Sequence, residues 1–409
     1  MLRPVYASHL VVHLLITLYP AVLFVLRQET GESYAVLGGT YGAAMLVYGL
    51  GALPVGALAN RVRPLTFLRV STVGAALASG AIAIAPSPLL FAAALIALGA
   101  ACSIHHTAAL TLITRVGNSD PRLFGHYGML GNLGLAIAPA FGGVLAAVAG
   151  WRLPFAAGCA LACGVAAWLV VGGRRIDDGA PVAVLAAREP QRTDPVCLAL
   201  VYVISASLGF VYTGFAAFLP AITGLRVDFL PAQPVVRGGI VASCVFAIGF
   251  FGQWWGGYAG RRGRLETRYA LVIGLNAACL LAAFALGDWG LIAVLAVFSF
   301  AHFSTQPLEN TLIAKFTSHQ ARAMSFAVSC VLAFGVGSLG AWAAGSVADL
   351  AGERLQYVFL LLAAVAAVAT LCAAALRVAA RRAHAQVPSG GPAAAAAPAP
   401  PPADARAPS

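Results

Sequence analysis

The sequence predicts an all-α membrane protein in which twelve transmembrane helices form two parallel six-helix repeats. Three observations support this: an apolar composition, apolar runs long enough to cross a bilayer, and a repeat that relates the two halves. Of the 409 residues, 60% are hydrophobic and 10% are charged, whereas soluble domains carry roughly 25% charged residues. A water-soluble core cannot absorb this surplus of apolar side chains, so lipid is the expected solvent.

Nearly uncharged runs recur along the whole chain, and a helix of about 20 apolar residues crosses a hydrocarbon layer roughly 30 Å thick. The runs lack the alternating pattern of barrel strands, so we expect helices. The first six expected spans cover residues 7–26, 34–59, 65–85, 89–114, 124–149 and 154–171. The last six cover residues 196–223, 236–258, 269–286, 291–314, 323–349 and 355–376.

These spans divide the chain into two halves, residues 1–172 and 196–378. Residues 173–195 are polar and of mixed charge, which predicts a flexible cytoplasmic linker. Residues 379–409 are rich in Pro and Ala, which predicts a disordered cytoplasmic tail.

The basic residues indicate how the chain is oriented. If the N-terminus is cytoplasmic, only five of the 25 Lys and Arg residues fall on the opposite side: Arg27, Arg152, Arg226, Arg237 and Arg354. Excess positive charge marks cytoplasmic loops, so both termini are expected in the cytoplasm. The charge of +11 forms no basic patch or arm, which argues against a nucleic-acid partner. The preference for Arg over Lys, with abundant Ala, favours the inner membrane of a GC-rich bacterium.

The two halves match each other at a constant shift of 200 residues. Residues 111–115 (TLITR) correspond to residues 311–315 (TLIAK), Pro20 to Pro220, and residues 56–61 to residues 256–261. An even number of spans in each half gives both the same orientation. The repeat therefore predicts two parallel units with a cavity between them.

The loops after the second and eighth spans carry a related pattern, GALANRVR at residues 56–63 and GGYAGRRGR at residues 256–264. It resembles the Gly-x-x-x-Asp-Arg-x-Gly-Arg pattern of the major facilitator superfamily of secondary transporters. The glycine would let helices approach closely, while the arginines would hold the helix ends at the headgroups and against facing termini. Positive-inside anchoring would explain the arginines alone. The expected conformational-switch residues are Gly56, Asn60, Arg61, Arg63, Gly256, Gly260, Arg261 and Arg264.

Neither copy has the family's aspartate, since Asn60 and Gly260 stand in its place. The sequence therefore does not predict a charged latch at this point.

The fifth span contains GLAIAPAFGG at residues 134–143, which resembles an exporter motif of the same family, Gly-x-x-x-Gly-Pro-x-x-Gly-Gly. A proline inside a span leaves a carbonyl unpaired, and small residues let a neighbouring helix slide or bend. Packing of small residues without a role in export is the alternative. The expected hinge residues are Gly134, Pro139, Gly142 and Gly143.

Ionisable groups inside the membrane are the default candidates for function because they are costly to bury. Of fourteen acidic residues, Glu309 is the only one that we place well inside a span. Its helix face also carries His302, Gln306 and Asn310. A carboxyl lining a central cavity could take up and release a proton as access alternates. The alternative is a structural ion pair of Glu309 with Lys315 or Arg322.

Histidines supply further candidates, because imidazole exchanges protons near neutral pH. The first span contains His9 and His13, one turn apart, and the fourth contains His105 and His106. Adjacent helical residues point about 100° apart, so at most one of His105 and His106 should face the cavity. The family resemblance implies that spans 1, 4, 7 and 10 line the path. It adds three candidates from the seventh span, Tyr202, Ser205 and Tyr212. Our site prediction includes His13, His105, His106 and Tyr212, together with the face of Glu309.

We find no nucleotide-binding loop, no metal-ligand set of credible spacing and no nucleophile elbow. The sequence thus favours a monomeric secondary transporter without cofactor, metal or enzymatic activity. The hypothesis is export of a small molecule by alternating access in exchange for protons, among membrane lipids. A proton-coupled uptake symporter for an organic acid and a transporter-like sensor remain alternatives, and a membrane-embedded enzyme is less favoured.

Overall fold

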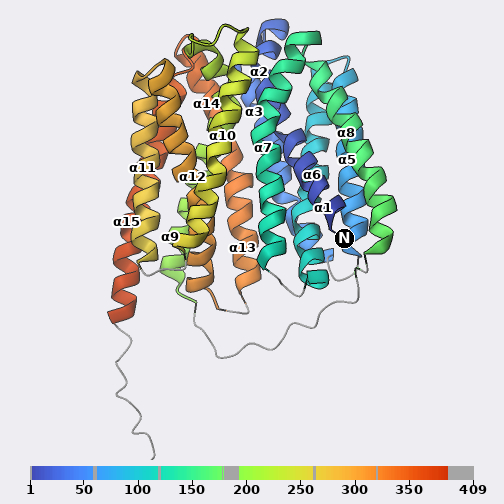
Figure 1. Cartoon of the computed structure of the whole chain (residues 1–409). Coiled ribbons are helices and arrows are strands. Elements are labelled where there is room, and N and C mark those ends of the chain that lie inside the picture. The colour runs from blue at the N-terminus through green and yellow to red at the C-terminus, as the bar shows by residue number, and fades with distance from the viewer. Residues whose placement is uncertain are drawn as a thin grey trace, which may run out of the picture.

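The computed structural model describes residues 2–58, 62–117, 121–176, 178, 193–260, 264–318 and 321–385. Within these ranges the regular structure is helical and contains no strand (Figure 1). In the described part of the chain, twelve helical segments are long and apolar enough to cross a membrane. The predicted class, an all-α membrane protein with twelve spans, is confirmed.

The N-terminal half consists of α1 (Arg3–Ile16), α2 (Leu18–Thr30), α3 (Tyr34–Leu50), α4 (Ala52–Leu58), α5 (Pro64–Ile84), α6 (Pro88–Gly117), α7 (Pro121–Ala149) and α8 (Arg152–Gly172). The C-terminal half consists of α9 (Pro195–Arg226), α10 (Pro234–Ala259), α11 (Leu265–Ala285), α12 (Asp288–Phe316), α13 (Arg322–Cys330), α14 (Leu339–Leu350) and α15 (Tyr357–Ala385). Between α13 and α14 lie a π-helical segment, Val331–Gly335, and a 3-10 turn, Val336–Ser338. The spans match the expected ones to within a few residues, and the last runs on to Arg382.

Two of the spans in the first half are interrupted a few residues before a proline. Pro20 has no N–H to offer the carbonyl four residues earlier, and the helix is interrupted at Thr17, between α1 and α2. At the interruption, the Thr17 N–H bonds to the carbonyl of Leu14. The Thr17 hydroxyl donates to the carbonyl of His13 at 2.6 Å. In the second span, Pro54 likewise has no N–H for the carbonyl of Leu50 four residues earlier, and α3 ends at Leu50 before α4 begins.

The two halves lie side by side, with the N-terminus and the end of α15 at the same end of the bundle (Figure 1). We call this the terminal end and the opposite one the far end. The largest apolar core draws residues from both halves, such as Leu23 and Tyr34 with Phe215 and Ala341. Two smaller cores each belong to one half, and they include residues near the chain ends, Leu2 in one and Ala380 in the other. Among the described residues, the halves thus share a core toward the far end and have separate cores at the terminal end.

Glycines allow backbones of the two halves to touch at the far end. A Cβ added to Gly38 of α3 would lie 2.2 Å from the carbonyl oxygen of Ala341 in α14, and one added to Gly143 of α7 would lie 2.4 Å from that of Val235 in α10. Real Cβ atoms are not found so close to other atoms, so only glycine permits this approach.

Charged groups tie the halves together at the same end. The Asp349 carboxylate accepts hydrogen bonds from the backbone N–H groups of Tyr34, at 3.0 Å, and Ala35, at 2.8 Å. These are orphan donors in the first turn of α3, where negative charge is favourable. Arg27 and Glu353 form an ion pair across the same boundary. Charged contacts therefore hold the two halves together at the far end. The loop pattern that lacks the family's aspartate lies at the opposite, terminal end.

We expect Asp349→Asn to loosen the far end, because the amide group would set an N–H against one of the two backbone donors. If the free energy that favours the closed far end falls by about 1 kcal/mol, the equilibrium shifts about fivefold toward the open form. Opening of the far end can be measured with a cysteine introduced at Ala341, which is fully buried. The background is a variant without the native cysteines, and the reagent is a membrane-impermeant maleimide. The label should react at least about fivefold faster than in the parent.

The matched control is Asp288→Asn. Asp288 also accepts a backbone hydrogen bond, from Asp228 at 2.7 Å, but both residues belong to the C-terminal half. Equal labelling rates in the two variants would show that Asp349 does not hold the halves together.

Two expectations about the segments outside the spans need correction. Residues 379–385, assigned to the disordered tail, continue α15. Ala and Arg are strong helix formers, and basic residues are favourable in a last helical turn. The start of the predicted flexible linker is also ordered: Gly173–Arg175 form a 3-10 turn, and Asp178 is buried with its carboxylate 3.4 Å from the Leu65 backbone N–H. Residues 179–192 and 386–409 lie outside the described residues.

Candidate functional site

A cavity of about 180 Å³ lies between the two halves. The N-terminal half contributes His13 of α1 and Asn132 and Leu135 of α7. The C-terminal half contributes residues of α9, α10, α12, α13 and the π-helical segment, among them Tyr212, Gln253, His302, Gln306, Glu309 and Asn310. The predicted face of the tenth span therefore lines a cavity to which both repeats contribute.

Glu309 is held by three hydroxyl groups. Its Oε1 accepts hydrogen bonds from Ser205 Oγ at 2.7 Å and Ser329 Oγ at 2.9 Å, and its Oε2 accepts one from Tyr269 at 2.7 Å. These donors come from α9, α13 and α11, so four helices meet at one carboxylate. Buried carboxylates need such partners, because an unsatisfied charge in an apolar interior is strongly unfavourable.

Among the described residues, the alternative ion pair of Glu309 with Lys315 is not formed. Lys315 Nζ lies 2.5 Å from Glu266 Oε1 instead, and the side chain of Arg322 is not among those described. Within the described part of the chain, no Lys or Arg forms an ion pair with Glu309. Its carboxylate lines the cavity and is bound by neutral groups.

A chain of amides crosses the cavity wall from one half to the other. Asn132 of α7 donates to Gln253 of α10, and Gln253 Nε2 donates to Gln306 Oε1 of α12 at 2.9 Å. Sequence reasoning singled out Gln306 but missed Asn132 and Gln253. The available signal was an uncharged amide inside an apolar span, which needs a partner as a charged group does.

Aromatic stacking fixes His302 on the cavity wall. Its ring stacks on Tyr212 at a centroid distance of 5.8 Å and on Phe298 at 5.3 Å. Its buried Nδ1 has no hydrogen-bond partner among the described atoms. Of the candidates from the seventh span, Ser205 and Tyr212 line the cavity, whereas Tyr202 is not among the described lining residues.

The histidines of α6 lie behind this wall. His105 is fully buried, with Nε2 2.9 Å from Ser8 Oγ and Nδ1 3.1 Å from the Tyr127 hydroxyl. The ring of His106 lies 5.1 Å from that of His13, measured between centroids. Neither His105 nor His106 is among the described residues that line the cavity, so His106 reaches it only through His13.

The expected hinge of α7 packs closely against three helices. A Cβ added to Gly134 would lie 2.3 Å from the Leu10 carbonyl oxygen, and one added to Gly142 would lie 2.6 Å from Ala21 Cβ. Gly143 lies against α10, as described above. The Pro139 carbonyl oxygen lies 2.4 Å from the position of a Cβ on Gly239, so α7 and α10 meet through backbone atoms.

The loop pattern is only partly visible, because Asn60, Arg61 and Arg261 lie outside the described residues. The close approach expected at its glycine is present at Gly256, where a Cβ would lie 2.5 Å from the Ser304 carbonyl oxygen. At Gly56 no described atom lies within 4 Å of that position, so none of the described helices requires this glycine.

The other described residues of the pattern lie near the terminal end. A Cβ on Gly260 would lie 3.1 Å from the Thr311 hydroxyl. The exposed Arg63 lies 4.0 Å from the carboxylate of Asp178, and Arg264 adopts a left-handed backbone with φ of 67° where α11 begins. Among these residues, Arg63 contacts a residue of the linker rather than a facing helix terminus.

Two halves of six membrane-spanning segments each, around a cavity to which both contribute polar side chains, form the architecture of a membrane transport protein. The chain belongs to the Major Facilitator Superfamily, whose family model matches residues 5–335.

Solved transporter structures share the fold. A bacterial homolog of the human lysosomal transporter Spinster, in an inward-facing and occupied conformation, superposes with a TM-score of 0.75 at 17% identity, covering 93% of this chain and 96% of the other. The nucleoside transporter NupG superposes with a TM-score of 0.72 at 16% identity, covering 91% of this chain and 98% of the other. A POT family transporter in complex with 5-aminolevulinic acid superposes with a TM-score of 0.74 at 11% identity, covering 92% of this chain and 96% of the other. No curated protein matches the sequence.

Proposed function

We propose that this chain is a proton-coupled secondary transporter that exports a small molecule by alternating access. The observation that carries the proposal is the Glu309 carboxylate, which lines the cavity between the halves and has three hydroxyl partners. A carboxylate without a paired cation can bind and release a proton when water reaches it from either side. Hydroxyl partners can reorient to accept a hydrogen bond once the carboxyl is protonated.

The proposed cycle alternates between two arrangements of the halves. The protein acts as a monomer in the inner membrane, with both termini in the cytoplasm, so the terminal end faces the cytoplasm. Cargo enters there while the far end is closed by the contacts of α3 with α14 and of α7 with α10. The halves then rock, the far end opens, and a proton returning through Glu309 resets the cycle.

The proposed direction rests on the resemblance of the α7 motif to an exporter motif, and the position of that motif supports a role in the conformational change. Gly143 and Pro139 stand where the two halves touch, so the exporter-like residues lie at contacts that must break and reform in each cycle. Similar folds belong to one transporter named for nucleosides and to a POT family transporter seen with 5-aminolevulinic acid, which supports a small polar solute as cargo.

The proposal is tested in two steps. A deletion strain is first compared with its parent for sensitivity to a panel of drugs and metabolites. Compounds to which the deletion strain is hypersensitive are then added to everted vesicles that hold an acidic interior and a pH-sensitive dye. Exchange of cargo for protons will make the interior less acidic in vesicles with the protein and leave empty vesicles unchanged. A dye signal that does not respond to any such compound contradicts proton exchange.

A second function, proton-coupled uptake of an organic acid, is favoured by the two imidazoles on the cavity wall. His13 and His302 face the cavity from opposite halves and could bind a carboxylate between them when protonated. Accumulation of an organic acid in proteoliposomes under an inward proton gradient would support uptake and contradict export.

A further inference from the structure

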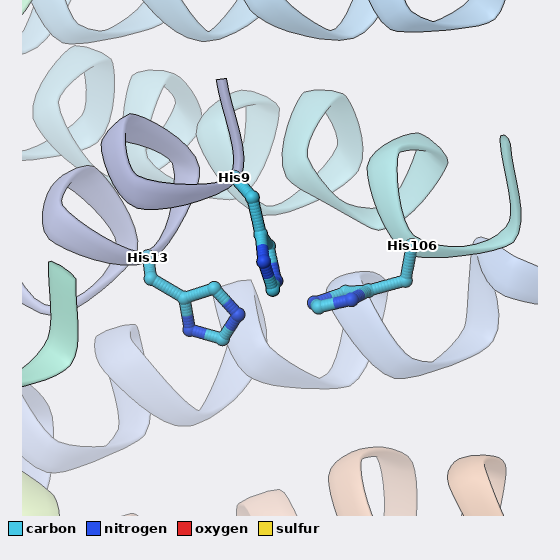
Figure 2. Close-up of side chains that lie close together, drawn as sticks. All are labelled: His9, His13 and His106. Atoms are coloured by element: carbon cyan, nitrogen blue, oxygen red, sulfur yellow. The ribbon is translucent and has the colours of Figure 1, made fainter. Parts of the chain in front are cut away.

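Three histidines of the N-terminal half converge beside the cavity. His9 and His13 lie one turn apart on α1, and His106 comes from α6. One ring nitrogen of each lies within 4.8 Å of the others. Figure 2 shows the three rings directed at a common point from two helices. His9 is buried and the other two are half-buried, so the group is not a chance gathering of surface side chains.

The hydrogen bonds of His9 determine which of its nitrogens is free. His9 Nδ1 lies 2.7 Å from the backbone carbonyl oxygen of Tyr127. A carbonyl can only accept, so Nδ1 carries the proton and Nε2 keeps its lone pair. That Nε2 is buried and has no partner among the described atoms. A histidine that donates to a carbonyl through one nitrogen and leaves the other bare has the arrangement found in metal-binding histidines.

A second chain of hydrogen bonds gives the same result for His106. The Ser8 hydroxyl donates to the Val5 carbonyl at 2.8 Å, so His105 Nε2 must donate to Ser8 Oγ. His105 Nδ1 then accepts from the Tyr127 hydroxyl. With its proton used, that hydroxyl accepts from His106 Nδ1 at 3.2 Å. The Nε2 of His106 is therefore left as a bare lone pair.

We propose that His9, His13 and His106 form a binding site for a divalent transition-metal ion of the Zn²⁺ type. Neutral imidazole is a preferred ligand of Zn²⁺, and sites with three protein ligands keep a fourth position open. Zinc-bound nitrogens lie about 3.4 Å apart for bonds of about 2.0–2.1 Å in a tetrahedron. The rings must therefore move inward by about an ångström when the ion binds. Rotation of half-buried rings such as His13 and His106 permits this.

The position of His13 gives the site an entry path. His13 lines the cavity between the halves, so an ion could arrive from it and the open coordination position would face it. An anionic or chelating solute in the cavity could complete the coordination shell. The site does not depend on the proposed proton exchange at Glu309, which belongs to the other half.

Metal binding to the full-length protein in lipid nanodiscs tests the site directly. The protein is purified without a polyhistidine tag, and binding of radioactive Zn²⁺ is measured by equilibrium dialysis. We expect one site per chain, with affinity reduced more than about tenfold in His13→Gln and in His106→Gln, since loss of supporting groups alone costs about 10–100-fold. Co²⁺ in place of Zn²⁺ should give the visible absorption of a four-coordinate site, and this absorption should be lost in the same variants.

The matched control is His126→Gln, which removes an exposed histidine and should leave Zn²⁺ affinity unchanged. His9 is packed against Gly131, where an added Cβ would lie 2.3 Å from the ring, so substitutions of His9 risk disturbing the fold. His13→Gln and His106→Gln therefore carry the test, and each is checked for unchanged thermal unfolding. Binding of Zn²⁺ by both variants with the affinity of the parent, or no binding by the parent, overturns the proposal. Neither result would affect the proton exchange proposed at Glu309.

Discussion

Glu309→Gln is expected to abolish proton-driven transport while leaving cargo binding in place. Glutamine keeps the shape of the side chain and can still bond to the hydroxyls of Ser205, Ser329 and Tyr269, but it cannot take up a proton. A group positioned for proton transfer typically raises a rate by about 10²–10⁴-fold. We therefore expect the rate of cargo transport coupled to protons to fall by at least about 100-fold. The measurement is cargo-dependent proton movement in proteoliposomes, made alongside counterflow of labelled cargo without a gradient.

Counterflow separates loss of coupling from loss of structure. It should continue in Glu309→Gln, because exchange of cargo for cargo needs no net proton movement. Asp228→Asn serves as the matched control, since Asp228 is an exposed acid on the loop between α9 and α10. If Glu309→Gln exchanges protons for cargo as the parent does, Glu309 is not the coupling group.

Gly239→Ala is expected to hold the far end open. Its new Cβ would lie 2.4 Å from the Pro139 carbonyl oxygen of the other half, and a backbone atom cannot move aside as a flexible side chain can. Overpacking of this kind costs about 1–3 kcal/mol. A difference of that size shifts a two-state equilibrium by about 5–150-fold. Labelling of the cysteine introduced at Ala341 should accelerate within that range, and net transport should fall.

The control for this variant lies on the same helix. Gly257 also belongs to α10, but no described atom lies within 4 Å of a Cβ at that position. Gly257→Ala should therefore leave both labelling and transport unchanged. Equal labelling in Gly239→Ala and Gly257→Ala would show that the contact of α7 with α10 does not limit opening.

The fold could be predicted from the sequence because its main determinants are local. Apolar runs set the spans, and the correspondence of Pro20 with Pro220 and of Gly56 with Gly256 revealed the repeat. The shared helix face of His302, Gln306 and Glu309 followed from helical periodicity alone, and these residues lie on the cavity wall.

The parts of the site that could not be predicted depend on contacts between distant segments. Asn132 meets Gln253 across the boundary of the halves, and His106 meets His9 and His13 from another helix. The spacing of His9 and His13 was visible, but the third ligand cannot be located without knowing which faces of α1 and α6 meet. The π-helical segment after Cys330, which places Ala333 and Phe334 on the cavity wall, also has no signal in the apolar pattern.

The uneven division of the apolar core has a consequence for energetics. At one end both halves contribute to a single core, whereas at the other each half has its own. Reversing the arrangement exposes the apolar surface that the two halves share, and this loss of burial opposes the change. A solute that binds equally well to both arrangements could not shift the equilibrium between them. Turnover therefore requires cargo or protons that bind more tightly to the less favoured arrangement, and this preference, rather than affinity alone, determines what can be carried.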